Sequence, residues 1–108
     1  MYKEFNITPE TVKRLIEFRD ARNWEKYHTS PELARAIAGE AQELSELYLW
    51  GRNPESYKYY KEIADIAIYL LYFCKLNDVN LDDAINSAID INEKNYPLSS
   101  GDRPDRDK

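Results

Sequence analysis

The sequence predicts an all-α protein whose four helices form a small bundle. Four segments carry apolar residues three and four positions apart, which is the spacing of an amphipathic helix. Short stretches rich in Pro, Asn and Gly separate these segments, and no stretch alternates apolar and polar residues as a strand would. Because the connections are short, neighbouring helices are expected to run antiparallel.

The first helix is predicted from Thr8 to about Trp24, because the Thr8 side chain can cap the helix and Pro9 suits its first turn. The second helix is predicted from Ser30, as its cap, to about Trp50, where a glycine follows. In both cases the start is indicated by a hydroxyl residue directly before a proline.

The third helix is predicted from about Glu55 to Leu76, and the fourth from its cap Asn80 to near Tyr96. The third helix is apolar on almost all sides, so we expect a second copy to pack against it in a homodimer or a dimer of dimers. One domain over residues 1–97 is expected, followed by a disordered tail of low apolar content at 98–108.

Composition excludes several classes of function. The chain has 108 residues and a formal net charge of −5, which argues against a nucleic-acid polymer as partner. The single cysteine, Cys74, excludes an intrachain disulfide and favours a reducing compartment. The first ten residues contain no apolar run, and the longest apolar stretch, residues 63–74, is too short to span a bilayer. We therefore expect a cytoplasmic protein with no membrane partner.

Two acidic pairs lie at one-turn spacing on or near apolar helix faces. Glu40 and Glu43 adjoin the predicted core stripe of the second helix, and Glu62 and Asp65 repeat the spacing in the third. Asp65 is the only charge within residues 63–74, so its burial is costly unless it is paired or binds a cation. The core stripe consists of Leu33, Ile37, Ala41, Leu44 and Tyr48.

If these two helices pack together, four carboxylates converge. Oxygen ligands favour hard cations, so the cluster predicts a Mg²⁺ site, with Mn²⁺ as the alternative ion. The competing interpretation is that the carboxylates lie on solvated helix faces, as most acidic pairs do. A di-iron bundle would need two E-x-x-H motifs, and the single histidine, His28, allows only one.

Three stretches, FRDARNWEKYHTSPELARAIAGEAQELSELYLW, KEIADIAIYLLYF and DINEKNYP, resemble the MazG-like nucleotide pyrophosphohydrolases, in particular their single-domain, dCTP pyrophosphatase-like branch. The likeness covers roughly residues 15 to 97. It implies an all-α, usually dimeric fold that hydrolyses nucleoside triphosphates between the α and β phosphates. By match of motif, the Mg²⁺ ligands and catalytic residues are Glu40, Glu43, Glu62 and Asp65.

The resemblance also implies six substrate-binding residues: Trp24, His28, Trp50, Tyr69, Asn92 and Tyr96. Trp24 and His28 match positions near the base, where an indole can stack and an imidazole can hydrogen-bond. Trp50 either lines the same pocket or anchors the end of its helix. For the last three, contact with sugar and phosphates competes with simple packing or capping.

The implied reaction is metal-assisted hydrolysis of a (deoxy)nucleoside triphosphate, with a pyrimidine such as dCTP as first candidate and Glu43 as candidate base. Relatives often carry a basic residue where this chain has Ala88, so phosphate contacts are expected to be fewer, or supplied by Lys61, Lys94 or a partner subunit. Two other functions stay open. One is a catalytically silent helical dimer that binds a protein partner, and the other is a pyrophosphohydrolase acting on a phosphoribosyl-nucleotide.

Overall fold

The computed structural model describes residues 7–98, and within them every regular element is helical. The all-α class and the four helices are confirmed. The predicted tail, residues 98–108, lies outside the described residues apart from its first position. The helices are α1 (Pro9–Ala21), α2 (Ser30–Glu46), α3 (Ser56–Leu76) and α4 (Leu81–Asn95), with the 3₁₀ turns η2 (Trp24–Tyr27) and η3 (Leu49–Gly51).

The helix starts follow from their caps. The side chains of Thr8 and Asn80 cap α1 and α4, as predicted. For α2 the prediction was wrong by one residue, because the cap is Thr29 and Ser30 is already helical. The Ser30 hydroxyl instead contacts the side-chain amide of Asn77, which follows α3, and so links the start of α2 to the end of α3.

Two helix ends were predicted too late. The first helix ends at Ala21 rather than Trp24, and the second ends at Glu46 rather than Trp50. Asn23 has a left-handed backbone (φ 56°), which asparagine tolerates, and it separates α1 from η2. Trp50 also has a left-handed backbone (φ 62°), which is strained for a bulky residue and breaks the helical path.

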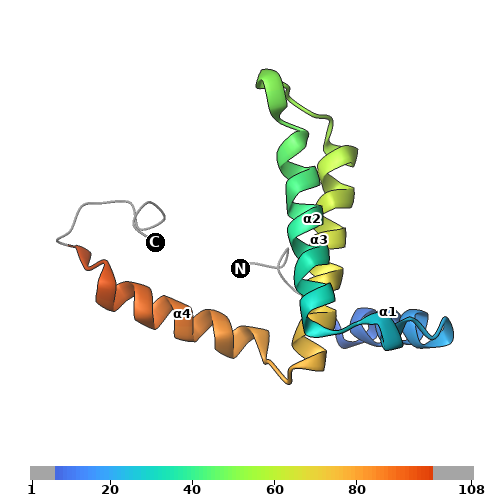
Figure 1. Ribbon diagram of the computed structural model, residues 1–108. Coiled ribbons are helices and arrows are strands. Elements are labelled where there is room, and N and C mark those ends of the chain that lie inside the picture. The colour runs from blue at the N-terminus through green and yellow to red at the C-terminus, as the bar shows by residue number, and fades with distance from the viewer. Residues whose placement is uncertain (1–6, 99–108) are drawn as a thin grey trace.

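The centre of the fold is the antiparallel pair of α2 and α3, which lie side by side (Figure 1). Leu33 on α2 is only 1% exposed, and Tyr72 and Cys74 on α3 are also buried. Two members of the predicted core stripe, Ala41 and Tyr48, are exposed, because one neighbouring helix covers only one side of α2.

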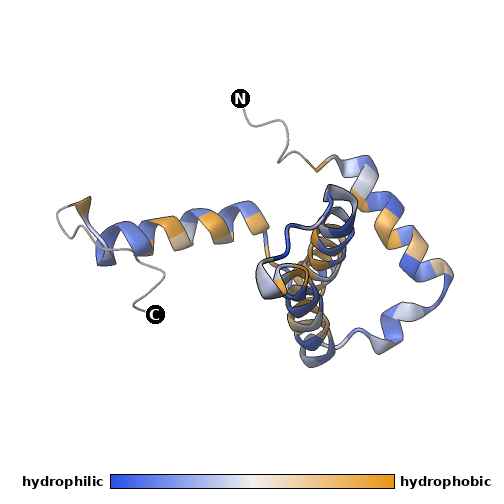
Figure 2. Cartoon of the chain, turned by 90° about the horizontal axis from the view of Figure 1, so that it is seen from above, coloured by the Kyte–Doolittle hydropathy of each residue, from blue (hydrophilic) through white to orange (hydrophobic). Residues whose placement is uncertain are grey.

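α1 and α4 lie on different sides of this pair. α1 crosses near the C-terminal half of α3, where the Tyr72 hydroxyl donates a hydrogen bond to the Leu15 carbonyl at 3.2 Å. α4 extends away from the pair in both Figure 1 and Figure 2, and it leaves apolar side chains exposed, among them Ile85, Ile89 and Ile91. The four helices of one chain therefore do not close into a bundle by themselves. None of the helices within residues 7–98 combines the length and hydrophobicity needed to cross a membrane.

Candidate functional site

The packing of α2 on α3 brings three carboxylates together. Glu40 comes from α2, and Glu62 and Asp65 come from successive turns of α3. One carboxylate oxygen of each residue lies within 4.8 Å of the other two, and all three side chains are half-buried. Three negative charges at such distances repel one another, so this carboxylate cluster is unfavourable unless it holds protons or a cation.

The surroundings of Glu40 oppose its ionisation. Burial raises the pKa of the Glu40 carboxyl above its ordinary value, and the neighbouring charges of Glu43, Glu62 and Asp65 raise that pKa further. Glu40 Oε1 and Glu62 Oε1 are buried, and no group in the described residues donates a hydrogen bond to either. Buried carboxylate oxygens without donors are the feature expected of atoms that bind a cation.

Asp65 has a counter-charge that was not predicted from the sequence. Lys61 Nζ lies 2.7 Å from Asp65 Oδ2, one turn earlier on α3. The Lys61 side chain is 70% exposed and that of Asp65 is 29% exposed, so the ion pair lies at the rim of the cluster. The hydrogen bond and charge of Asp65 raise the pKa of the Lys61 ammonium. The apolar run itself contains no basic residue, but the preceding turn supplies one.

Glu40, Glu62 and Asp65 fit a hard divalent cation, because every donor is a carboxylate oxygen and two of these oxygens lack other partners. Glu43, the fourth predicted ligand, is exposed and lies outside this close group. Its charge still acts on Glu40. The assignment of all four residues to metal binding remains a prediction.

A cavity of about 640 Å³ between α1, η2 and α3 adjoins the carboxylate cluster. Its wall includes Asp65 of the cluster together with three predicted substrate-binding residues, Trp24, His28 and Tyr69. Most of the remaining wall is apolar, from residues such as Leu15, Phe18, Ala67, Ile68 and Leu71. A flat, apolar ligand group would therefore lie directly beside the carboxylates in this aromatic cavity.

Two aromatic side chains define how the aromatic cavity can recognise a ligand. Trp24 packs edge-on against Phe18, with ring centroids 5.5 Å apart, and stays partly exposed. Burial lowers the pKa of His28, and the positive charge of Arg19 lowers it further, so the imidazole is neutral at neutral pH. His28 Nδ1 is buried without a partner among the described residues. A neutral imidazole offers one donor and one acceptor to a ligand.

Two residues that support this wall were missed. The His28 ring lies 4.9 Å from that of Tyr72, and the Arg19 guanidinium lies 5.4 Å from the same ring. Arg19 is buried and pairs with Asp20 at 2.8 Å. The seven-residue spacing from Asp65 could have indicated Tyr72, because it places both residues on one helix face. Nothing local distinguishes Arg19 from a solvated helix residue.

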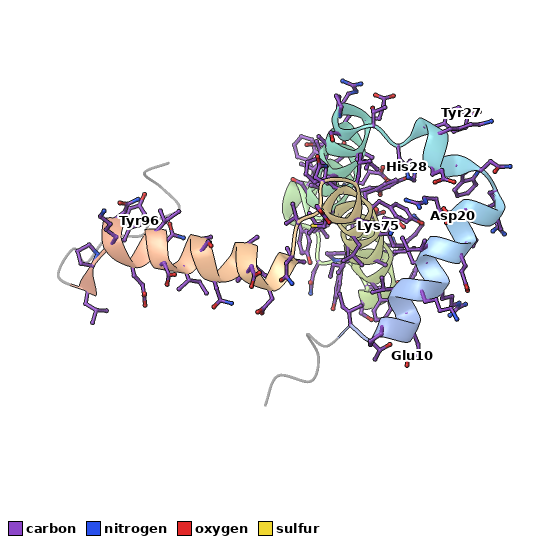
Figure 3. The ribbon with its side chains drawn as sticks, turned by 90° about the horizontal axis from the view of Figure 1, so that it is seen from below. Glu10, Asp20, Tyr27, His28, Lys75 and Tyr96 are labelled. Carbon is purple, nitrogen blue, oxygen red and sulfur yellow. The ribbon has the colours of Figure 1, made fainter. Side chains whose placement is uncertain are left out.

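Three predicted substrate-binding residues lie elsewhere in the single chain. Trp50 is 92% exposed in η3, at the end of the α2–α3 pair remote from α1. Asn92 and Tyr96 belong to α4 and its cap, and Figure 3 shows Tyr96 well separated from His28. None of the three lines the aromatic cavity. Their roles stay predictions.

No protein-family model matches the chain. Human dCTP pyrophosphatase 1 is 36% identical over 101 residues, which are 83% of this chain and 59% of that protein. The rat dCTP pyrophosphatase 1 is 32% identical over 102 residues, which are 84% of this chain and 60% of that protein. The chain thus spans only 59% to 60% of the length of these curated relatives.

The fold also matches a solved structure, that of a pyrophosphatase from Archaeoglobus fulgidus. The two are 36% identical with a TM-score of 0.71, and the match covers 82% of this chain and 90% of the other. The sequence identity and the coverage of both chains are high enough to indicate common descent.

Proposed function

Because the chain belongs to the family of MazG-like nucleotide pyrophosphohydrolases, we propose that it hydrolyses (deoxy)nucleoside triphosphates to the monophosphate and pyrophosphate. A pyrimidine nucleotide such as dCTP is the proposed preferred substrate, since the curated relatives are named dCTP pyrophosphatases. The proposed location is the cytoplasm, which agrees with the free thiol of Cys74.

One observation carries this proposal. Asp65 belongs both to the carboxylate cluster and to the wall of the aromatic cavity. A nucleotide has an apolar, flat base and a highly charged phosphate chain, so it needs these two kinds of surface next to each other. In the aromatic cavity, Trp24 would stack on the base and His28 would hydrogen-bond its edge.

Glu40, Glu62 and Asp65 would hold Mg²⁺, or Mn²⁺, which when bound neutralises phosphate charge and lowers the pKa of water. During hydrolysis the water oxygen bonds to the α phosphorus, and the bond from that phosphorus to the α–β bridging oxygen breaks. Pyrophosphate leaves with the bridging oxygen. The attacking water approaches from the side opposite the leaving oxygen and gives its proton to solvent or to a carboxylate that the metal does not hold.

We further propose that two copies of the chain associate. The isoleucines of α4 are exposed in the single chain, and a second copy would cover them. Trp50, Asn92 and Tyr96 lie outside the aromatic cavity, so their predicted roles also require a second copy whose cavity they complete. Light scattering coupled to size exclusion tests this directly, and a monomer at enzymatically active concentrations would contradict it.

The activity is tested by pyrophosphate release from a panel of canonical and modified nucleoside triphosphates, with Mg²⁺ or with EDTA. Asp65→Asn should lower Mg²⁺-dependent release by at least about 100-fold, because metal-held charge stabilisation is worth several kcal/mol. Asp83→Asn removes the same charge from an exposed position on α4 and serves as the matched control.

Unchanged release by Asp65→Asn would contradict the metal assignment. If pyrophosphate is released only from a phosphoribosyl-nucleotide, then that class of nucleotide, and not the nucleoside triphosphates, is the substrate. If the folded protein releases pyrophosphate from no nucleotide and Mg²⁺ leaves its stability unchanged, the silent binding module is the better interpretation.

A further inference from the structure

A second cavity, of about 480 Å³, opens where the connection between α2 and α3 closes the hairpin. Glu43 and Glu62 form the part of its wall that belongs to the acidic pairs. Arg52 and Lys58 bring positive charge to the same wall. This hairpin cavity therefore meets the carboxylate cluster at Glu62, whereas the aromatic cavity meets it at Asp65.

The order of side chains along α3 places the two cavities at opposite ends of the cluster. Lys58, Glu62, Asp65 and Tyr69 follow one another at intervals of four, three and four residues, so they share one face of the helix. With a rise of about 1.5 Å per residue, Lys58 lies about 6 Å before Glu62, and Tyr69 lies about 6 Å beyond Asp65. The face thus presents a cation, then carboxylates, then an aromatic ring.

Both cations of the hairpin cavity keep donors for an anion, although Arg52 already donates to two carbonyls and the Lys58 ammonium lies 6.0 Å from the centroid of the Tyr57 ring. Arg52 donates to the Leu49 carbonyl from Nε at 3.0 Å and to the Glu46 carbonyl from Nη2 at 2.9 Å. These carbonyls fix the guanidinium without neutralising it. Within residues 7–98, neither Arg52 nor Lys58 forms an ion pair with a carboxylate.

Because carboxylates are in excess in the wall of the hairpin cavity, an anion can bind there only together with a divalent cation. Glu43, Glu46, Glu55 and Glu62 outnumber Arg52 and Lys58 in the hairpin cavity. The cavity alone is therefore net negative and repels a free anion. A divalent cation at the carboxylate cluster engages Glu62 and leaves three carboxylates against two cations, so it lowers the net charge of the wall from −2 to −1 and brings its own positive charge to the anion.

We propose that the hairpin cavity binds the β and γ phosphates of the substrate, the part that leaves as pyrophosphate, through Lys58 and Arg52. This inference rests on the proposed function. The nucleotide then lies along α3 with its base at the Tyr69 end, its α phosphorus at the carboxylate cluster and its diphosphate end at Lys58. Charge-assisted hydrogen bonds from an ammonium and a guanidinium suit this group. They also supply the basic contacts that Ala88 cannot make.

The test is calorimetric titration with methylenediphosphonate, a diphosphate analogue that cannot be hydrolysed, in the presence of Mg²⁺. Lys58→Gln should weaken its binding about tenfold, as expected for one charge-assisted hydrogen bond. Lys75→Gln, at the opposite end of α3 and also exposed, should bind like the wild type. Binding of dCMP should be unchanged in both variants, and EDTA should abolish binding of the analogue to the wild type.

Equal binding of the analogue by wild type and Lys58→Gln would overturn the inference, as would absence of binding by the wild type. If the wild type releases pyrophosphate from nucleotides while Lys58→Gln changes neither the analogue affinity nor KM, only the inference fails. If the wild type hydrolyses no nucleotide, the proposed function fails instead. Arg52→Gln should also weaken analogue binding, and a matched melting temperature would show that its loss is not caused by unfolding of the α2 end.

Discussion

Replacing Glu40 by Gln should stabilise the metal-free protein at neutral pH. The pKa of Glu40 is raised in the folded state from its ordinary value of 4.5, so the folded state binds this proton more tightly than the unfolded state. Stability therefore falls as the pH rises from 4.5 through the raised folded pKa, and above that interval the loss is complete. Glutamine keeps the shape of the side chain and removes the charge that causes the loss.

The size of the effect follows from the distances in the carboxylate cluster. Oxygens of Glu62 and Asp65 lie within 4.8 Å of an oxygen of Glu40. Two unit charges at that distance repel by about 0.9 kcal/mol in a water-like dielectric, and Glu40 faces two of them. Solvent screening and the Lys61 ammonium reduce the sum. We expect Glu40→Gln to gain about 1 to 1.5 kcal/mol in free energy of unfolding.

The assay is thermal unfolding in EDTA between pH 5 and 8 at one protein concentration. The expected gain corresponds to a rise in Tm of roughly 5 to 10 °C for a domain of this size. Added Mg²⁺ should raise the Tm of the wild type but not of Glu40→Gln. The difference in Tm between the two proteins should therefore shrink or change sign. Glu46→Gln, an exposed position on the same helix, is the control and should change little. If Glu40→Gln is no more stable than the wild type at pH 8 in EDTA, repulsion among the carboxylates does not destabilise the metal-free protein, and the reasoning is refuted.

Two other substitutions test the aromatic cavity and the core. Trp24→Ala should raise KM for the nucleotide by about 10- to 100-fold in steady-state kinetics, because stacking of a base on an aromatic ring is worth about 1 to 3 kcal/mol. An unchanged KM would remove Trp24 from the base site, and Tyr27→Ala, an exposed ring in the same turn, is the control. Leu33→Ala should lower the free energy of unfolding by about 2 to 5 kcal/mol in urea titrations, because Leu33 is only 1% exposed. Leu49→Ala, half-exposed in η3, should cost far less, and equal losses would mean that the α2–α3 contact is not the core.

The helix starts and ends that were predicted correctly are determined by residues adjacent in the sequence. The caps Thr8 and Asn80 lie next to the helices they begin, and α3 and α4 end within one residue of prediction. The cap of α2 was misplaced because Thr29 and Ser30 are neighbours with equivalent hydroxyl groups. The Thr29 hydroxyl accepts from the Glu32 N–H, whereas the Ser30 hydroxyl bonds to Asn77 at the end of α3. The contact between Ser30 and Asn77 is a tertiary interaction, which the local sequence does not reveal.

The site was predictable where it depends on helix periodicity and unpredictable where it depends on packing. Spacing along each helix was enough to pair Glu40 with Glu43 and Glu62 with Asp65. The rotational position of α2 about its axis, relative to α3, determines which three of the four carboxylates converge. In the structure this position leaves Glu43 outside the close group. The burial of Arg19 similarly depends on α1 lying across α3, which no pattern within α1 reveals.

The ion pair between Lys61 and Asp65 makes metal binding a competition. A cation that coordinates Asp65 through Oδ2 has to displace the Lys61 ammonium, which lies 2.7 Å away. The measured affinity for the cation is therefore lowered by the free energy of the ion pair that is broken. Added monovalent salt acts on both sides of this exchange, because it screens the lysine contact as well as the attraction of the divalent ion. Divalent affinity at this protein should therefore depend less on ionic strength than it would at a carboxylate cluster with no lysine of its own.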